Sequence, residues 1–163
     1  MSVIVEDGSN IQNANSYVSE DDFTAYMDAR GESYDGSNVT SLLISAMDYI
    51  ESYTFSNDPT YSDQALSFPR NKDEFIPNEI KKAQLILARN AINIDIMPNP
   101  TSDKVITSET QEVSDAVTVS YTYANSGINS DGSISTSQKR LRFQEVDKLL
   151  RKYKSSNNFL VRS

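Results

Sequence analysis

The sequence contains no cysteine, no histidine and no tryptophan. The first two absences exclude disulfides, Cys- or His-based zinc sites, and Ser–His–Asp or Cys–His catalytic arrangements. No glycine-rich phosphate loop is present, since the five glycines are scattered. No apolar run approaches the roughly 18 residues that span a bilayer, and the chain does not begin like a signal peptide. We therefore expect no catalytic residues, metal site, cofactor or membrane association, and synthesis in a cytoplasm.

Hydrophobic residues are scarce, at 37% of 163 residues, and the mean hydropathy is low. This length suits one domain with a modest core. The predicted division is a helical domain over 1–154 and a C-terminal tail over 155–163. Part of the stability of such a subunit is expected to come from neighbouring copies.

Charge is divided unevenly along the chain. Residues 139–163 hold eight basic and two acidic side chains, a net charge of +6, whereas the other 138 residues hold seven basic and 21 acidic ones, a net charge of −14. A basic end on an acidic body fits a tail that docks on an acidic surface. It fits equally a solvated last helix whose cations favour the negative helix end.

Four segments show the three-to-four-residue apolar spacing of an amphipathic helix. They are predicted at 20–30, at 40–53, from Pro77 towards the prolines at 98 and 100, and at 141–153. Ser19 is a good N-cap for the first helix, and Gly31 is a natural stop after it. Pro77 suits a first helical turn.

The spacing of apolar residues along the chain changes after residue 104. Apolar and polar residues alternate over 117–123, which predicts a strand, and Lys104–Thr107 is a plausible partner across 109–115. Residues 125–138 are rich in Ser, Asn and Gly and predict a flexible loop. The expected fold is therefore mainly α: a small bundle of about four helices with a β-hairpin inserted at 104–123 and extended termini.

Acidic clusters are the only sign of a metal site. Glu20-Asp21-Asp22 is explained better by a helix start, and Asp73-Glu74 by a polar loop. Asp35-Gly36-Ser37 and Asp131-Gly132-Ser133 resemble partial calcium loops, but neither continues to the closing Glu. Turns are therefore the better interpretation.

Five blocks in a fixed order nevertheless resemble a known family. They are 14–19 followed by Phe23 and Tyr26, 46–51, 64–70, 76–83 with 87–88, and 142–150. Together they are similar to the small head-to-tail adaptor (connector) proteins of tailed bacteriophages, many of which are labelled DnaT-like single-stranded-DNA-binding proteins. The chain departs from that pattern at Phe68, where Trp is usual, and in a longer loop at 125–138.

The resemblance implies a structural virion protein of the neck, and not an enzyme. It would form a homo-oligomeric ring, typically a dodecamer, that completes the head, joins the portal to a tail or nozzle protein and continues the channel. Duplex DNA would pass through without specific binding, and an acidic wall suits this because it repels phosphate. The resemblance also implies contact residues. Portal-contact candidates are Lys152, Lys154, Phe159, Leu160, Val161 and Arg162, and subunit-contact candidates are Val117, Val119, Tyr121 and Tyr123.

Single-stranded-DNA binding in replication is the main alternative. The basic C-terminus and some of the nine tyrosines would supply it. The acidic body opposes it, and most tyrosines lie on helix stripes or in the predicted hairpin. An enzyme, such as a carboxylate-based hydrolase, has no positive motif.

Overall fold

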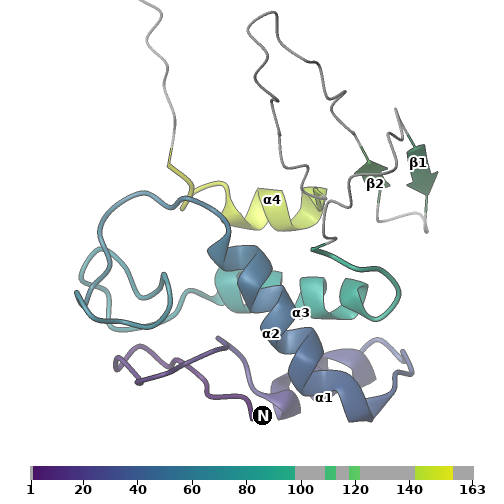
Figure 1. The fold of residues 1–163 in the computed structure, drawn as a ribbon, viewed down its shortest axis with the longest axis horizontal. Coiled ribbons are helices and arrows are strands. Elements are labelled where there is room, and N and C mark those ends of the chain that lie inside the picture. Colours follow the sequence, from purple (N-terminus) through teal and green to yellow (C-terminus); the bar gives the residue numbers. More distant parts are fainter. Residues whose placement is uncertain (1, 98–108, 113–117, 122–141, 156–163) are drawn as a thin grey trace, which may run out of the picture. The chain divides into compact units, whose positions relative to one another are not determined.

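The computed structural model describes residues 2–97, 109–112, 118–121 and 142–155 (Figure 1). The chain divides into two compact units: Met1–Ile96 with Lys148–Ser163, and Met97–Asp147. Each unit is treated by itself below. The proposed boundary between a domain over 1–154 and a tail over 155–163 stays a prediction.

Helix α1 spans Glu20–Asp28 and begins as predicted. The Ser19 hydroxyl accepts a hydrogen bond from the Asp22 amide at 3.0 Å, and the Asp22 carboxylate accepts one from the Ser19 amide at 2.9 Å. This reciprocal capping satisfies two groups that a helix start leaves unpaired. Gly31 follows the helix with a φ of +65°, a conformation that suits glycine.

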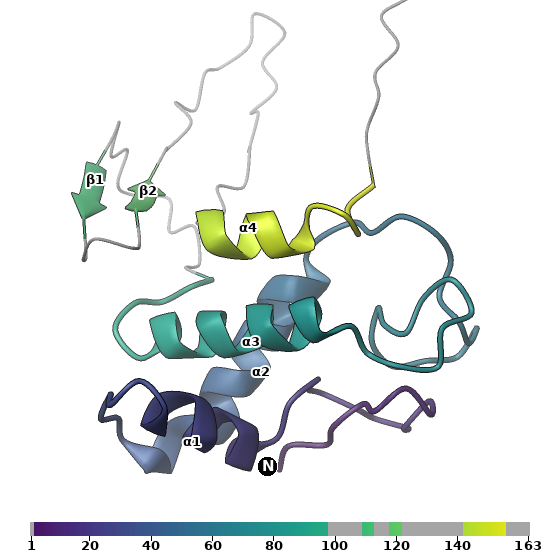
Figure 2. The ribbon, with the colours of Figure 1, turned by 180° about the vertical axis from the view of Figure 1, so that it is seen from behind.

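Helices α2, Val39–Glu51, and α3, Asn78–Ala91, form the centre of the first unit. A short 3₁₀ turn, Gly36–Asn38, leads into α2, and the Asp35 carboxylate caps it by accepting the Ser37 amide at 2.9 Å. Helices α2 and α3 cross and share the largest helix contact, while α1 touches both, as the opposite views of Figures 1 and 2 show. Their fully buried apolar side chains include Leu43, Ile50, Ile80 and Leu87.

The N-terminal segment is an extended arm rather than an edge strand of a sheet. Its pairing consists of backbone bonds from the Glu6 amide to the Ser16 carbonyl at 2.8 Å and from the Asn15 amide to the Ile4 carbonyl at 2.9 Å. Gly8 turns the arm with a φ of +113°, and a Cβ there would lie 2.3 Å from the Glu74 carbonyl oxygen. Only glycine fits this close approach.

Helix α4, Gln144–Leu150, is shorter than the predicted 141–153. The chain leaves the helix because residues after Leu150 pair with the connection after α2. The Ser56 amide donates to the Tyr153 carbonyl at 2.7 Å, and the Ser155 amide donates to the Thr54 carbonyl at 3.1 Å. Phe143, Val146 and Leu150 are buried, and Leu149 and Tyr153 are half-buried.

Strands β1, Glu109–Glu112, and β2, Thr118–Tyr121, pair antiparallel with Glu109 opposite Tyr121. The mainly helical class with four α-helices is confirmed for the described residues, but the inserted hairpin is not supported as predicted. The partner strand was placed at 104–107, outside the described residues, whereas β1 occupies the segment assigned to the turn. The alternation rule missed β1 because Glu-Thr-Gln-Glu is polar throughout, and a two-stranded ribbon can pair without an apolar face.

Candidate functional site

A buried glutamine joins the N-terminal arm to α2 and α3. The Gln84 side chain is fully buried. Its oxygen accepts the Tyr17 amide at 2.8 Å, and its nitrogen donates to the Ser16 hydroxyl at 2.8 Å and to the Leu43 carbonyl at 2.9 Å. Every partner is itself buried or in the core, so this amide fixes how three segments meet.

A second polar contact lies at the end of α2. The Glu51 carboxylate accepts hydrogen bonds from the Tyr17 hydroxyl at 2.5 Å, the Ser67 amide at 3.0 Å and the Ser67 hydroxyl at 2.7 Å. The Tyr17 hydroxyl also accepts the Phe68 amide at 3.2 Å. Burial, followed by the nearby Glu51 charge, raises the pKa of Tyr17 well above its ordinary value, so it stays a neutral donor.

Phe68 anchors the long connection between α2 and α3. Its ring is 1% exposed and makes edge contacts with Phe55 at 4.9 Å, Tyr153 at 5.4 Å and Tyr17 at 6.2 Å between ring centroids. The following Phe68–Pro69 peptide bond is cis. The aromatic cluster therefore ties the connection to the arm and to the last described segment.

Arg70 is a structural residue within that connection. Its guanidinium donates to the Ser56 and Ser67 carbonyls, each at 3.0 Å, and to the Asn57 carbonyl. A planar fork of donors suits several carbonyls at once, which a lysine could not match. The Pro-Arg pair is therefore explained by the loop it holds.

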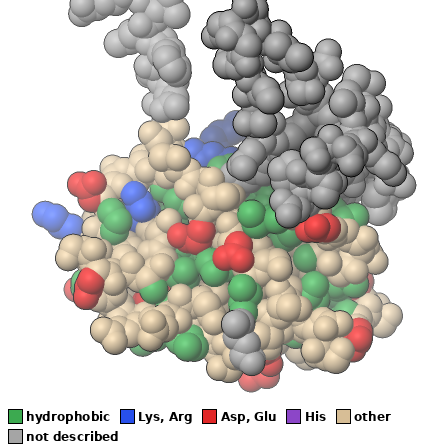
Figure 3. All heavy atoms as spheres, in the orientation of Figure 1, with side chains coloured by type: hydrophobic (Ala, Val, Ile, Leu, Met, Phe, Trp, Pro, Cys, Tyr) green, Lys and Arg blue, Asp and Glu red, His purple; other side chains and the backbone are tan. Residues whose placement is uncertain are grey.

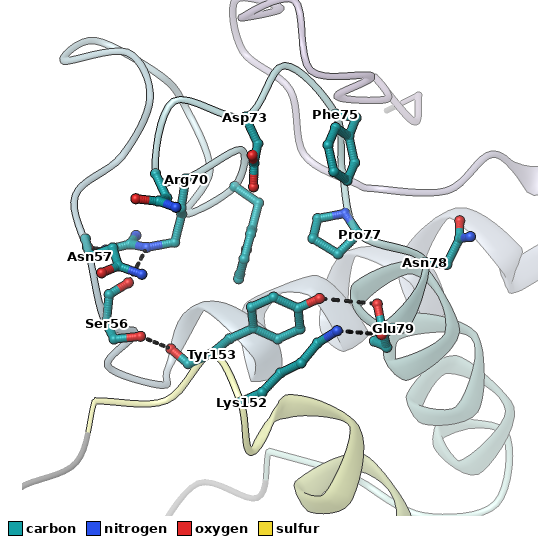
Figure 4. Close-up of a pocket in the computed structure, with 12 residues that line it drawn as sticks. Ser56, Asn57, Arg70, Asp73, Phe75, Pro77, Asn78, Glu79, Lys152 and Tyr153 are labelled. Carbon is teal, nitrogen blue, oxygen red and sulfur yellow. Dashed lines mark hydrogen bonds and ion pairs between the residues drawn. The ribbon is translucent and has the colours of Figure 1, made fainter.

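A groove of about 540 Å³ opens between this connection and the last described segment, within the first unit (Figure 4). Glu79 lies at its edge and accepts the Lys152 ammonium at 2.5 Å and the Tyr153 hydroxyl at 3.0 Å. We call the contact of Glu79 with Lys152 and Tyr153 the Glu79 clasp. The lining residues are Ser56, Asn57, Phe68, Arg70, Asn71, Asp73, Phe75, Pro77, Asn78, Glu79, Lys152 and Tyr153.

The clasp predicts a pH dependence. The bond from Lys152 is the main cause of a lowered pKa for Glu79. A depressed carboxyl pKa stabilises the fold above the ordinary Glu value, and this contribution is lost as pH falls through the lowered value. Glu79→Gln should therefore lower the melting temperature at pH 7, and the difference from the unmodified chain should be smaller at about pH 3.

Thermal unfolding followed by circular dichroism between these two pH values would measure the effect. Glu74→Gln is the matched control, because no described side chain pairs with this exposed carboxylate, and it should show little difference at either pH. A Glu79→Gln difference that is equally large at acid pH would contradict the ionic clasp.

The predicted portal contacts have only partly defined positions. Lys152 is exposed but engaged in the clasp, and Lys154 lies 3.8 Å above the centre of the Tyr53 ring. Both cations are thus committed to contacts within the chain. Phe159, Leu160, Val161 and Arg162 lie outside the described residues.

The predicted subunit contacts lie in or beside the ribbon. Val119 and Tyr121 belong to β2, whereas Val117 and Tyr123 lie outside the described residues. Their role in contacts between subunits stays a prediction.

The described surface is acidic and offers few free aromatic faces. Residues 2–97 hold 16 acidic and six basic side chains. On the face drawn in Figure 3, acidic side chains lie at separate points and the basic ones lie in the upper part. Of the seven tyrosines whose side chains are described, two are buried and five are half-buried.

The described residues contain no group of three acidic, histidine or cysteine side chains that could hold a metal ion. Asp22 and Glu20 have structural partners, since Asp22 caps α1 and Glu20 accepts a hydrogen bond from the Thr40 hydroxyl. None of the helices within the described part is long and apolar enough to cross a membrane.

Sequence reasoning did not identify Gln84, Glu51 or the Glu79 clasp. The available signal for Gln84 was a polar residue between Ala83 and Leu85 in an otherwise apolar helix stretch. Three of the five ordered blocks meet in the network of Tyr17, Glu51, Ser67 and Phe68, so these blocks form a scaffold.

Comparisons with known proteins agree with one part of the resemblance. The whole chain, residues 1–163, matches the model of a family described as "Putative DnaT-like ssDNA binding protein". No curated protein and no solved structure matches the chain.

Proposed function

We propose that this chain, which belongs to the DnaT-like family, is a structural adaptor of a tailed-phage virion that forms a ring between portal and tail. The main support for the proposal is where the residues of the ordered blocks lie in the structure. Residues of three blocks, Tyr17, Glu51 and Phe68, contact one another and hold a helical scaffold together.

The acidic charge of the described residues supports a channel lining that does not bind the DNA passing through it. An excess of ten acidic over basic side chains in residues 2–97 repels phosphate at short range. A ring of identical subunits needs two different complementary faces, one for each neighbour. The ribbon of β1 and β2 and the segment after Ser155 are the proposed reaching parts.

Single-stranded-DNA binding is the second candidate, and the family description supports it more directly than it supports the adaptor. Its physical requirements are a cationic groove and aromatic faces on which bases stack. Among the seven tyrosines whose side chains are described, none is fully exposed, and Lys152 is held by Glu79. We place this candidate second because residues 2–97 carry an excess of ten acidic side chains, which repel phosphate.

Assembly with the cognate portal is the direct test. Native mass spectrometry and electron microscopy of the mixed proteins should find a complex of the portal with several copies of this chain. Replacing Phe159, Leu160 and Val161 together by serine should weaken portal binding at least tenfold, since three apolar anchors are lost. Serine at Asn157 and Asn158 is the matched control. A strict monomer that joins neither portal nor tail protein would refute the adaptor.

Fluorescence anisotropy with a labelled single strand decides the second candidate. At about 150 mM salt, where weak phosphate attraction is screened, the adaptor predicts no binding at about 10 µM protein. Saturable binding in that range, lost when Lys139, Arg140 and Arg142 are replaced by alanine, would favour the DNA-binding function.

A further inference from the structure

Part of the lining of the groove beside the Glu79 clasp is apolar. Phe75 is 59% exposed, the largest exposed fraction among the large hydrophobic side chains of the described residues. Phe68, Pro77 and Tyr153 extend this apolar lining. Figure 4 shows Phe75 and Pro77 across the cavity from Tyr153. Such a hollow fits an apolar side chain from an extended peptide.

An acidic group lies on the same rim. Asp73 lines the groove and is exposed, and no described side chain pairs with its carboxylate. Arg70, the nearby cation, is occupied by three backbone carbonyls. A peptide that places a cation beside its apolar residues would therefore complement this site.

The chain itself leaves the described region at this groove. Lys152 and Tyr153 line it, and two residues later the Ser155 amide donates to the Thr54 carbonyl at 3.1 Å. The remaining eight residues contain Phe159, Leu160 and Val161 followed by Arg162. The four residues from Ser155 to Phe159 span up to about 14 Å, enough to bring Phe159 back over a hollow that starts at Tyr153.

We propose that this groove is a peptide-binding site whose occupant is the chain's own C-terminal segment, residues 156–163. Phe159 and its two aliphatic neighbours cover Phe75 and Pro77, and Arg162 pairs with Asp73. This inference concerns the isolated chain and does not depend on the adaptor function. In a virion, a portal that takes the same apolar residues would have to compete with the groove.

Because the segment belongs to the same chain as the groove, even a weak contact is sufficient to fill the groove. A short flexible linker holds its ligand at an effective concentration on the order of 1 mM. If the free peptide binds the groove with a Kd of roughly 100 µM, the tethered segment fills about 90% of the grooves and weakens a competing peptide about tenfold. The predicted signature is therefore competition between the chain's own segment and added peptide.

The experiment uses a fluorescent peptide with the sequence of residues 155–163 and full-length chains, with anisotropy as the readout. The peptide should bind a chain whose Phe159, Leu160 and Val161 are serine about tenfold more tightly than it binds the unmodified chain. Adding Phe75→Ser to that variant should weaken peptide binding at least tenfold. Adding Ile4→Ser, another exposed apolar residue outside the groove lining, should leave peptide binding unchanged.

Three results would overturn the proposal. They are equal peptide affinity for the unmodified chain and the serine variant, no binding to the serine variant, and equal binding of a peptide with the same residues in scrambled order. Circular dichroism of each variant checks that the fold is kept. The peptide assay contains no portal protein, so its outcome does not depend on whether the chain binds the portal. A failed peptide assay likewise leaves the proposed adaptor function untouched.

Discussion

Gln84→Ala should lower the free energy of unfolding by about 4 kcal/mol. The substitution removes three hydrogen bonds and leaves the Tyr17 amide without its partner in the interior, whereas the Ser16 hydroxyl keeps its bonds to Val18. A buried polar group left unsatisfied costs about 1–3 kcal/mol, and the cavity left by the side chain adds to this loss.

Urea unfolding followed by circular dichroism would measure this change as a shift in the midpoint at constant slope. Gln84→Met keeps most of the side-chain volume and should still cost about 3 kcal/mol, because the loss of hydrogen bonds dominates. Lys82→Ala, an exposed position on the same helix, is the control and should stay within about 0.5 kcal/mol. A Gln84→Ala cost below about 1 kcal/mol would mean that water replaces the amide and that the network does not hold the arm.

Phe68→Ala should cost about 4 kcal/mol, within the range for removing a fully buried aromatic ring. The ring contacts Phe55, Tyr153 and Tyr17, which come from three separate parts of the first unit. Its removal opens a cavity from which the arm, the connection after α2 and the last described segment all lose contacts. The loss is therefore expected to be global.

Phe75→Ala is the matched control for Phe68→Ala. It removes the same ring from the same connection, but Phe75 is 59% exposed where Phe68 is 1% exposed. The cost should be below about 1 kcal/mol, since a mostly exposed ring loses little apolar burial. Equal effects of the two substitutions, measured by urea unfolding, would contradict the role of Phe68 as the anchor of the connection.

These predictions bear on function because the network and the groove adjoin. Phe68 and Tyr153 belong to both the aromatic cluster and the groove lining. A variant that disturbs Phe68 would therefore alter groove binding through the fold, whereas Phe75→Ala and Asp73→Asn alter the groove alone. These two substitutions can therefore test peptide binding with little change in stability.

The sequence determined the helices because their signals are local. Ser19 and Asp22 define the start of α1, Gly31 follows its end, and three-to-four-residue apolar spacing marks α2 and α3. The absence of histidine and cysteine limits the available chemistry whatever the fold. Local patterns failed for β1, whose polar residues carry no alternation, and for α4, which ends early because the chain pairs with 54–56.

Only the tertiary structure decided which polar residues hold the fold and where a groove lies. Gln84 contacts residues 41 and 68 positions away, Glu51 contacts Tyr17 across 34, and Lys152 contacts Glu79 across 73. No periodicity predicts such partners, because they are set by how the helices pack and not by neighbours along the chain. The sequence by itself therefore determined a small, acidic, mainly helical protein without histidine or cysteine. The packing decided that its ordered motifs form a scaffold, and that the chain's last described residues line a groove.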